Sequence, residues 1–284
     1  MRVIRASTAG FCMGVSLAVG KLERALAGQN GPGLYTLGPI IHNPLLVREY
    51  EKKGAVCLED PRLAARGSTV IIRAHGLPRL QEEELFHLGL RVVDATCPKV
   101  KDAQTAIRRA GERGLGTLLL LGEKDHPEVR GLLSYAVGRP LVFSSLEELR
   151  GLPLDSGGEY FLAAQTTQDQ NSFEQVLEWL NSFLDKPVAV LRTICDATGR
   201  RQEELIRLAG QVNSMVIVGG LNSGNTRRLA DISRGLGLFT AQCEEAALLP
   251  LDELVSRQPV GLSAGASTPD AQIRDVEKIL RDFR

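Results

Sequence analysis

Three cysteines divide the chain into near-thirds, and each follows a short apolar run of the kind found in β-strands. Cys12, Cys97 and Cys195 lie in the segments VIRASTAGFCMGV, RVVDATCPKV and VLRTICDAT. They are much further apart in sequence than the ligands of a local zinc knuckle. If the three segments are equivalent parts of a repeat, three thiolates can meet at one point. They could then hold zinc or an iron–sulfur cluster with one coordination position left over.

Two further sets of polar residues recur in the three thirds, and the first set follows the cysteines at nearly constant offsets. A first polar residue comes four positions after a glycine that ends a predicted strand; these residues are His42, His126 and Ser223. A second polar residue ends the last predicted strand of each third; these residues are His75, Thr166 and Ser267. The agreement over three copies predicts an internal threefold repeat. Each third then offers a Cys, a His or Ser, and a His, Thr or Ser.

Three short segments carry side chains suited to proton transfer or to anion binding. His126 and Glu128 stand at a predicted helix start in HPEV. The Glu128 carboxylate could be a structural residue that the helix dipole stabilises, or it could relay a proton. Ser223 and Asn225 in NSGNTRR, with Ser267 in SAGAST, resemble a phosphate cradle of hydroxyls, amides and helix N-terminal N–H groups. Neither a Walker motif nor G-x-G-x-x-G occurs in the sequence, so nothing indicates a nucleotide.

The elements that must position these residues alternate between strand-like and helix-like patterns. Runs such as TVIIRAH and GTLLLLG alternate with segments such as DAQTAIRRAGERG, which predicts an α/β fold with mostly parallel sheets. We expect three similar α/β domains with pseudo-threefold symmetry around a central cavity. The expected domains span 13–97, 98–194 and 195–284, with the N-terminal strand 1–12 completing the third. Ligands of such sheets bind beyond the carboxyl ends of the strands.

Composition limits the classes of function. The 284 residues carry 34 basic and 34 acidic side chains, a net charge of +0, which argues against a nucleic-acid binder driven by bulk charge. The sequence has no long apolar run and no signal-peptide pattern, so we expect no membrane span and a cytoplasmic protein. Five scattered cysteines fit a reducing compartment. We interpret Cys57 and Cys243 as packing residues and His87 as a residue at a helix end or on the surface.

Nine segments in order resemble one known family. FCMGV, GPIIHN, RAHG, DATCPKV, HPEV, QTT, ICDAT, NSGNTRRL and SAGASTPD are similar to those of the LytB/IspH family of (E)-4-hydroxy-3-methylbut-2-enyl diphosphate reductases. The resemblance runs from about Cys12 to Pro269. It implies three α/β domains around an iron–sulfur cluster. It also implies the last step of the non-mevalonate isoprenoid pathway, in which two electrons and protons remove an allylic hydroxyl as water.

The resemblance also implies roles for individual residues. Cys12, Cys97 and Cys195 would hold a [4Fe–4S] cluster with one open iron. Glu128 would deliver protons, with His126 and Thr166 at the reacting end. The residues expected to bind the substrate are His42, His75, His126, Thr166, Ser223, Gly224, Asn225 and Ser267. The implied electron donor is a ferredoxin or a flavodoxin.

Three positions depart from the family pattern, and two other functions remain open. Glu123 stands where a His is common, Leu17 where an Arg is common, and Gly224 where a second Ser is common. None of these replaces a predicted cluster ligand or Glu128. The alternatives are a three-Cys iron–sulfur hydro-lyase, which needs no net electrons, and a non-enzymatic, zinc-bearing or metal-free diphosphate-binding protein.

Overall fold

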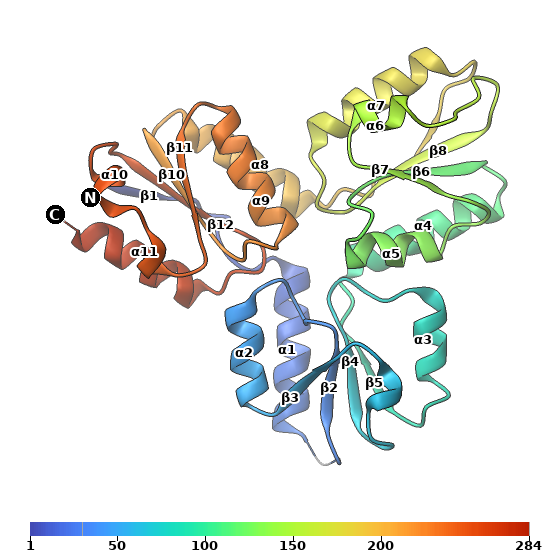
Figure 1. Cartoon of the computed structure of the whole chain (residues 1–284), viewed down its shortest axis with the longest axis horizontal. Helices are drawn as coiled ribbons and strands as arrows, with labels where there is room; N and C mark the ends of the chain where they lie inside the picture. The colour runs from blue at the N-terminus through green and yellow to red at the C-terminus, as the bar shows by residue number, and fades with distance from the viewer. Residues whose placement is uncertain (30, 284) are drawn as a thin grey trace. The chain divides into compact units, whose positions relative to one another are not determined.

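The computed structural model describes residues 1–29 and 31–283, and these form three four-stranded, fully parallel sheets flanked by helices (Figure 1). The α/β class with parallel sheets is therefore confirmed. Close contacts divide the chain into two compact units. Unit 1 comprises residues 1–16, 41–53 and 196–284, and unit 2 comprises residues 17–40 and 54–195. The three domain boundaries expected from the sequence stay a prediction.

Unit 1 contains one sheet, in the order β1-β12-β10-β11. Its strands are β1 (Val3–Arg5), β10 (Ser214–Val218), β11 (Phe239–Cys243) and β12 (Val260–Ala264). Its helices are α2 (Pro44–Lys52), α8 (Asp196–Ala209), α9 (Gly224–Gly235), α10 (Leu251–Val255), α11 (Asp270–Asp282) and the 3-10 turn η2 (Ala246–Leu248). Helix α1 (Met13–Ala27) begins in unit 1 and continues into unit 2.

Unit 2 contains two sheets, in the orders β3-β2-β4-β5 and β7-β6-β8-β9. The first is built from β2 (Leu34–Leu37), β3 (Ala55–Leu58), β4 (Thr69–Ile72) and β5 (Arg91–Asp94), with η1 (Pro61–Leu63) and α3 (Arg79–Leu85). The second is built from β6 (Thr117–Leu121), β7 (Leu141–Phe143), β8 (Tyr160–Ala164) and β9 (Ala189–Val190), with α4 (Pro98–Glu112), α5 (Pro127–Ser134), α6 (Leu146–Arg150) and α7 (Gln170–Phe183).

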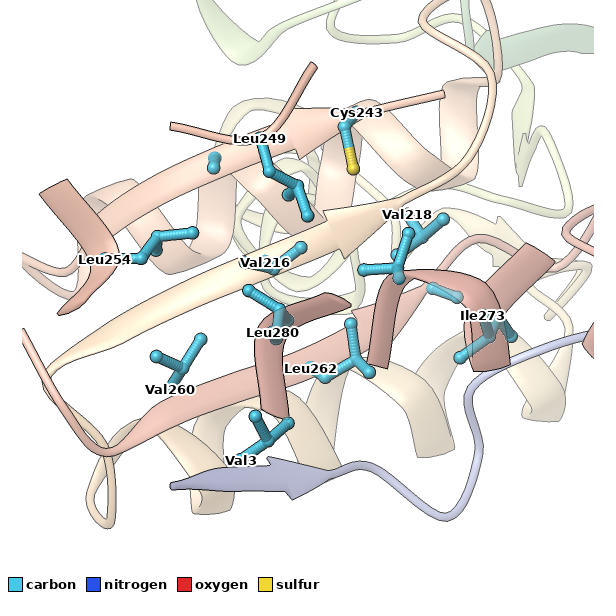
Figure 2. Packing of buried hydrophobic residues seen from close by; sticks show 13 residues of the cluster. Val3, Val216, Val218, Cys243, Leu249, Leu254, Val260, Leu262, Ile273 and Leu280 are labelled. Carbon is cyan, nitrogen blue, oxygen red and sulfur yellow. The ribbon is translucent and has the colours of Figure 1, made fainter. Parts of the chain in front are cut away.

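Both faces of the sheets are covered, which explains why the central strands are almost entirely apolar. Alternate residues of a strand point to opposite faces. In β10, Val216 and Val218 pack against α11, as Figure 2 shows for this cluster, whereas Met215 and Ile217 pack against α8 and α9. In β6 the same alternation places α7 on one face and α4 with α5 on the other.

The three sheets share one connectivity, which is the structural form of the internal repeat. Each sheet has two central strands, and the strand that comes next in sequence after the first central strand lies beside it at one edge. These edge strands are β3, β7 and β11. The other flanking strand is β5, β9 or β1, and each of these three leads directly to one of the cysteines predicted as ligands. In the unit 1 sheet, the N-terminal strand β1 thus occupies the edge position that β5 and β9 occupy in the two sheets of unit 2.

Candidate functional site

Each of the three cysteines is fixed by the same backbone hydrogen bond to the turn that ends a central strand. The N–H of Cys97 donates to the carbonyl of Ala74 (2.9 Å), that of Cys195 to Thr166 (2.8 Å) and that of Cys12 to Ala266 (3.1 Å). Each acceptor lies in the turn after β4, β8 or β12. The repeat therefore fixes each cysteine in the same way beside an equivalent turn.

The same turns correct one detail of the predicted repeat. Each contains a further hydrogen bond, from Gly76 to Arg73, from Gln168 to Gln165 and from Thr268 to Gly265. In this register the position equivalent to His75 and Ser267 is Thr167 rather than Thr166. The predicted equivalence of Thr166 was one residue out, because the sequence alone does not show where β8 ends and its turn begins.

The cysteine thiols have the chemistry that an iron–sulfur cluster requires. Cys12, Cys97 and Cys195 are half-buried and form no disulfide, and each stands within one residue of the first turn of a helix. Cys97 is the N-cap of α4, and the N–H of Val15 points at Cys12 Sγ (3.5 Å). Helix N-termini favour thiolates, so the donor set fits a thiolate-bound metal centre.

Whether the three thiolates meet at one point stays a prediction. Cys97 and Cys195 belong to unit 2, whereas Cys12 belongs to unit 1. Across residues 1–29 and 31–283, no three His, Cys, Asp or Glu side chains are grouped as a metal site.

The loop before Cys12 is held by side chains of α8, the helix that follows Cys195. The buried Arg201 donates through Nη2 to the carbonyl of Gly10 (2.6 Å). Glu204 accepts from the backbone N–H groups of Ser7 (2.7 Å) and Thr8 (2.8 Å). Burial raises the pKa of Glu204, but hydrogen bonds from the hydroxyls and the N–H groups of these two residues lower it to about 2. Helix α8 therefore fixes the backbone that presents Cys12.

Glu128 is a buried carboxyl that is hydrogen-bonded to Thr166 through both of its oxygens. It lies in the first turn of α5 and is 2% exposed. Its Oε1 accepts from the N–H of Thr166 (2.6 Å), and its Oε2 accepts from the Thr166 hydroxyl (3.0 Å). The structure thus brings together the two residues that the family resemblance placed in one proton-handling group.

The environment of Glu128 suits an acid that exchanges protons near neutral pH. Burial raises its pKa to about 7, opposed by the two hydrogen bonds from Thr166, which favour the carboxylate. No cation pairs with it in the described part of the chain. A carboxyl balanced in this way can both give up and regain a proton at neutral pH.

His126 and His75 of unit 2 lie next to one another at the start of the helix that carries Glu128. His126 is the N-cap of α5, and its Nδ1 accepts from the N–H of Glu128 (3.1 Å), with Pro127 at the first helical position. The rings of His75 and His126 meet edge to face, with their centroids 5.6 Å apart. The Nδ1 contact leaves Nε2 of His126 to carry a proton, so this imidazole can donate to an anion.

In unit 1 the start of α9 forms the other part of the predicted site. Ser223 is the N-cap of α9, Gly224 is its first residue, and Asn225 is buried. The Asn225 Nδ2 is a buried amide donor that has no hydrogen-bond partner in the described residues. Because an unpaired buried donor costs about 1–3 kcal/mol, this amide is a candidate donor to a ligand oxygen.

His42 and Ser267 are joined to the same region through the backbone. The Ser267 hydroxyl donates to the carbonyl of His42 (3.0 Å). A β-carbon on Gly220, in the turn before Ser223, would lie 2.8 Å from that carbonyl oxygen, so glycine permits the close approach. Unit 1 therefore gathers the segments of His42, Ser223, Asn225 and Ser267.

The remaining sequence predictions have clear outcomes. Cys243 is buried in the unit 1 core, where burial raises its thiol pKa to about 12, which confirms a packing role (Figure 2). Cys57 is half-buried on β3, and His87 is exposed after α3. Two of the residues that depart from the family pattern are Leu17 and Glu123. Leu17 is exposed on α1, and Glu123 donates its backbone N–H to Gln165 Oε1 (3.1 Å). Among the described residues, no helix has the length and apolar character that a membrane crossing requires.

Two residues at the site were not identified from the sequence. Asn43 is the buried N-cap of α2, and its Nδ2 donates to the carbonyl of Ser267 (3.0 Å) and to Gln272 Oε1 (3.1 Å). Gln165 is buried, and it donates from Nε2 to the Thr167 hydroxyl (3.2 Å). The Asn-Pro pair in HNPLL was the available signal for Asn43, since Asn at the N-cap and Pro at the next position favour a helix start.

Comparisons with known proteins identify the family of this chain. A family model described as LytB protein matches residues 3–281. A protein of Nitratidesulfovibrio vulgaris (strain Miyazaki F), named 4-hydroxy-3-methylbut-2-enyl diphosphate reductase, is 55% identical over 100% of both chains. A protein of Aquifex aeolicus with the same name is 42% identical over 99% of this chain and 96% of its own.

Two solved structures are also similar. One, titled as (E)-4-hydroxy-3-methyl-but-2-enyl diphosphate reductase, the terminal enzyme of the non-mevalonate pathway, is 40% identical, with a TM-score of 0.71 over 99% of this chain and 100% of its own. The E-1-hydroxy-2-methyl-but-2-enyl-4-diphosphate reductase of Plasmodium falciparum has a TM-score of 0.92 at 24% identity, over 99% and 88% of the two chains, and shows the fold. The chain belongs to the LytB protein family, an assignment that implies an iron–sulfur cluster.

Proposed function

We propose that this chain reduces (E)-4-hydroxy-3-methylbut-2-enyl diphosphate to isopentenyl diphosphate and dimethylallyl diphosphate. The reaction breaks the allylic C–O bond, consumes two electrons and two protons, and releases the hydroxyl as water. The observation that carries the proposal is the buried Glu128 carboxyl with a pKa of about 7, bonded to Thr166, in a chain whose full-length relatives are named as this reductase.

The cofactor that we propose is a [4Fe–4S] cluster held by Cys12, Cys97 and Cys195. Three half-buried thiols at helix N-termini match its ligand chemistry, and the other two cysteines of the chain lie on β3 and β11 instead. When bound, such a cluster supplies single electrons and, at an iron without a protein ligand, a Lewis acid for the substrate hydroxyl.

The diphosphate is bound in this proposal mainly by neutral donors and imidazoles. Asn225 supplies its unpaired amide, and the start of α9 supplies the backbone N–H of Gly224 and the hydroxyl of Ser223. The hydroxyl of Ser267 can turn from the His42 carbonyl toward a phosphate oxygen. The residues assigned to the diphosphate are His42, His75, His126, Ser223, Gly224, Asn225 and Ser267.

Glu128 and Thr166 handle protons at the other end of the substrate. A protonated Glu128 can pass its proton through the Thr166 hydroxyl, which lies 3.0 Å from Oε2 and can both accept and donate. Thr166 also holds the substrate hydroxyl in this scheme. His126, whose Nδ1 accepts from the backbone N–H of Glu128, is held by that bond at the start of the same helix.

The electrons come, in this proposal, from a one-electron protein donor such as a ferredoxin or a flavodoxin. A thiolate-held cluster and a low-potential donor both need a reducing compartment, so we also propose a cytoplasmic location.

The test is an anaerobic assay of the purified chain with the diphosphate substrate and a strong one-electron donor. We expect a brown protein with about four irons per chain, and two electrons consumed for each product formed. Turnover without reductant would contradict the reductase and favour a hydro-lyase. A colourless protein free of iron would contradict an enzyme with this cofactor. A Cys97→Ser variant that keeps its full cluster would overturn the ligand assignment.

A further inference from the structure

A small cavity in unit 2 is not used by any step of the proposed reaction. It has a volume of about 120 Å³, and it opens between the turn after β2, the end of β4 and the first turns of α3 and α5. The polar groups that line it come from Gly38, Glu59, Arg73, Gln81 and Arg130. None of the residues assigned to the cluster, the diphosphate or the proton path lines it.

Arg73 is the innermost cation of this cavity. The residue follows β4 directly and is half-buried, and burial lowers the pKa of its guanidinium. Its Nε is buried without a hydrogen-bond partner, and Arg73 forms no salt bridge with any residue in the described ranges. A buried cation normally needs a partner, because its desolvation is costly.

The chain makes room for this guanidinium at Gly38. A β-carbon on Gly38 would lie 2.1 Å from Nη1 of Arg73, and the residue also has a φ of +69°, which disfavours any other side chain. The positive φ therefore favours glycine at position 38, and a side chain there would also have to displace the guanidinium of Arg73 from its place in the cavity.

Arg130 supplies a second guanidinium at the rim. It projects from α5, is exposed, and contacts Asp125 through Nη2 at 3.3 Å, in a pair that is open to solvent and therefore weak. Glu59 is the one carboxylate in the lining; its charge raises the pKa of Arg73, yet it forms no ion pair with it. The lining as a whole is thus positively charged.

We propose that this cavity binds a small dianionic oxyanion, a phosphate group, with Arg73 holding it inside and Arg130 closing on it from the rim. Planar guanidinium groups form paired hydrogen bonds with phosphate oxygens, and the bond to Arg73 would satisfy its unpaired Nε–H. Arg73 lies two residues before His75, and Arg130 lies four residues after His126. A bound phosphate would therefore tie together the two segments whose imidazole rings meet at 5.6 Å.

The test is a calorimetric titration of the anaerobically purified holoenzyme with inorganic phosphate at constant ionic strength. Arg73→Leu should weaken phosphate binding about tenfold or more, and Arg130→Gln about threefold, because hydrogen bonds to a charged partner are lost. Arg139→Gln, which removes an exposed arginine of the same unit outside the cavity, is the matched control and should leave the affinity unchanged.

Two further arms test where the phosphate binds and which kind of anion the cavity accepts. Asn225→Ala should leave this phosphate site intact, because Asn225 belongs to unit 1, so a loss in that variant with full binding in Arg73→Leu would overturn the proposal. Tighter binding of acetate than of phosphate would contradict the proposal that the cavity binds a dianion. Arg130→Gln changes only an exposed side chain, so equal binding by this variant and the parent chain would count against the site even if Arg73→Leu did not fold.

Discussion

The two units use the same turn for different chemistry. In unit 1 the strand-end segments carry mostly neutral donors, namely Ser223, Asn225 and Ser267, with one imidazole, His42. The cation Arg201 of that unit is bonded to backbone carbonyls. In unit 2 the equivalent segments carry imidazoles and the buried acid Glu128. Neutral donors bind an anion at any pH near neutrality, whereas the acid and the imidazoles can change charge. In the proposed function, unit 1 therefore supplies binding groups, whereas unit 2 supplies the acid together with two of the diphosphate-binding imidazoles.

The largest expected effect is at the acid of unit 2. Glu128→Gln keeps the size of the side chain and removes the proton, so kcat should fall about 10²- to 10⁴-fold, the usual worth of a general acid. The substrate KM should change far less, because Glu128 does not bind the diphosphate in this account. Anaerobic steady-state kinetics measure both constants. An unchanged kcat in this variant would contradict the assignment of proton transfer to Glu128 of unit 2.

The matching change in unit 1 should affect binding instead. Asn225→Ala deletes the unpaired amide donor, so KM should rise about tenfold to a hundredfold, the worth of a hydrogen bond to a charged group. The value of kcat should stay within a few-fold. The same kinetics test this, with calorimetry of the substrate bound to the oxidised enzyme as an independent measure of affinity. A fall in kcat alone would place Asn225 among the proton-handling residues.

A smaller effect separates positioning from stability in unit 1. Asn43→Ala removes an N-cap and the bond to the carbonyl of Ser267, so it should cost about 1 kcal/mol of stability and raise KM about fivefold. Asp169→Ala removes the N-cap of α7 in unit 2, which accepts from Ser172 N–H (2.7 Å), and is the matched control. It should cost a similar amount in thermal unfolding and leave KM unchanged. Equal KM values for the two variants would contradict the positioning role.

The smallest effect concerns the two neighbouring threonines of unit 2. Thr166→Val deletes the hydroxyl that favours the Glu128 carboxylate, so the pKa of Glu128 should rise above 7 by about half a unit to one unit. Thr167→Val is the control, because the Thr167 hydroxyl accepts from Gln165, whereas the Glu128 carboxyl is bonded to Thr166. The carboxyl titration of each variant can be followed by infrared spectroscopy. Equal shifts in both would show that the contact is not specific.

The sequence was sufficient for much of this molecule, for identifiable physical reasons. Apolar runs that alternate with helical segments predicted the parallel sheets, because strands buried on both faces must be almost wholly apolar. Residues such as Cys97 and His126 could be placed because each is followed by a proline at a helix start. The pairing of Glu128 with Thr166 came from the family resemblance, since no local pattern links the two segments.

Other features could not be predicted because they depend on contacts between distant segments. Thr166 was aligned with His75 and Ser267, and only the hydrogen bond from Gln168 to Gln165 showed that Thr167 holds that place. Arg73 lies within the quoted segment RAHG. The cavity that it lines, however, is formed together with Gly38 and with residues of α5, which are distant in the sequence. The role of Asn43 depends on the carbonyl of Ser267, far along the chain.

The most direct test of the central claim is the titration of Glu128 itself. Infrared difference spectra of the oxidised holoenzyme and of Glu128→Gln, recorded across pH, isolate the band of the protonated carboxyl. We predict a midpoint at about pH 7, with the acid protonated below it and activity lost as the pH rises through it, because the carboxylate can no longer donate a proton. A midpoint near the ordinary glutamate value, about 4.3, would contradict the account.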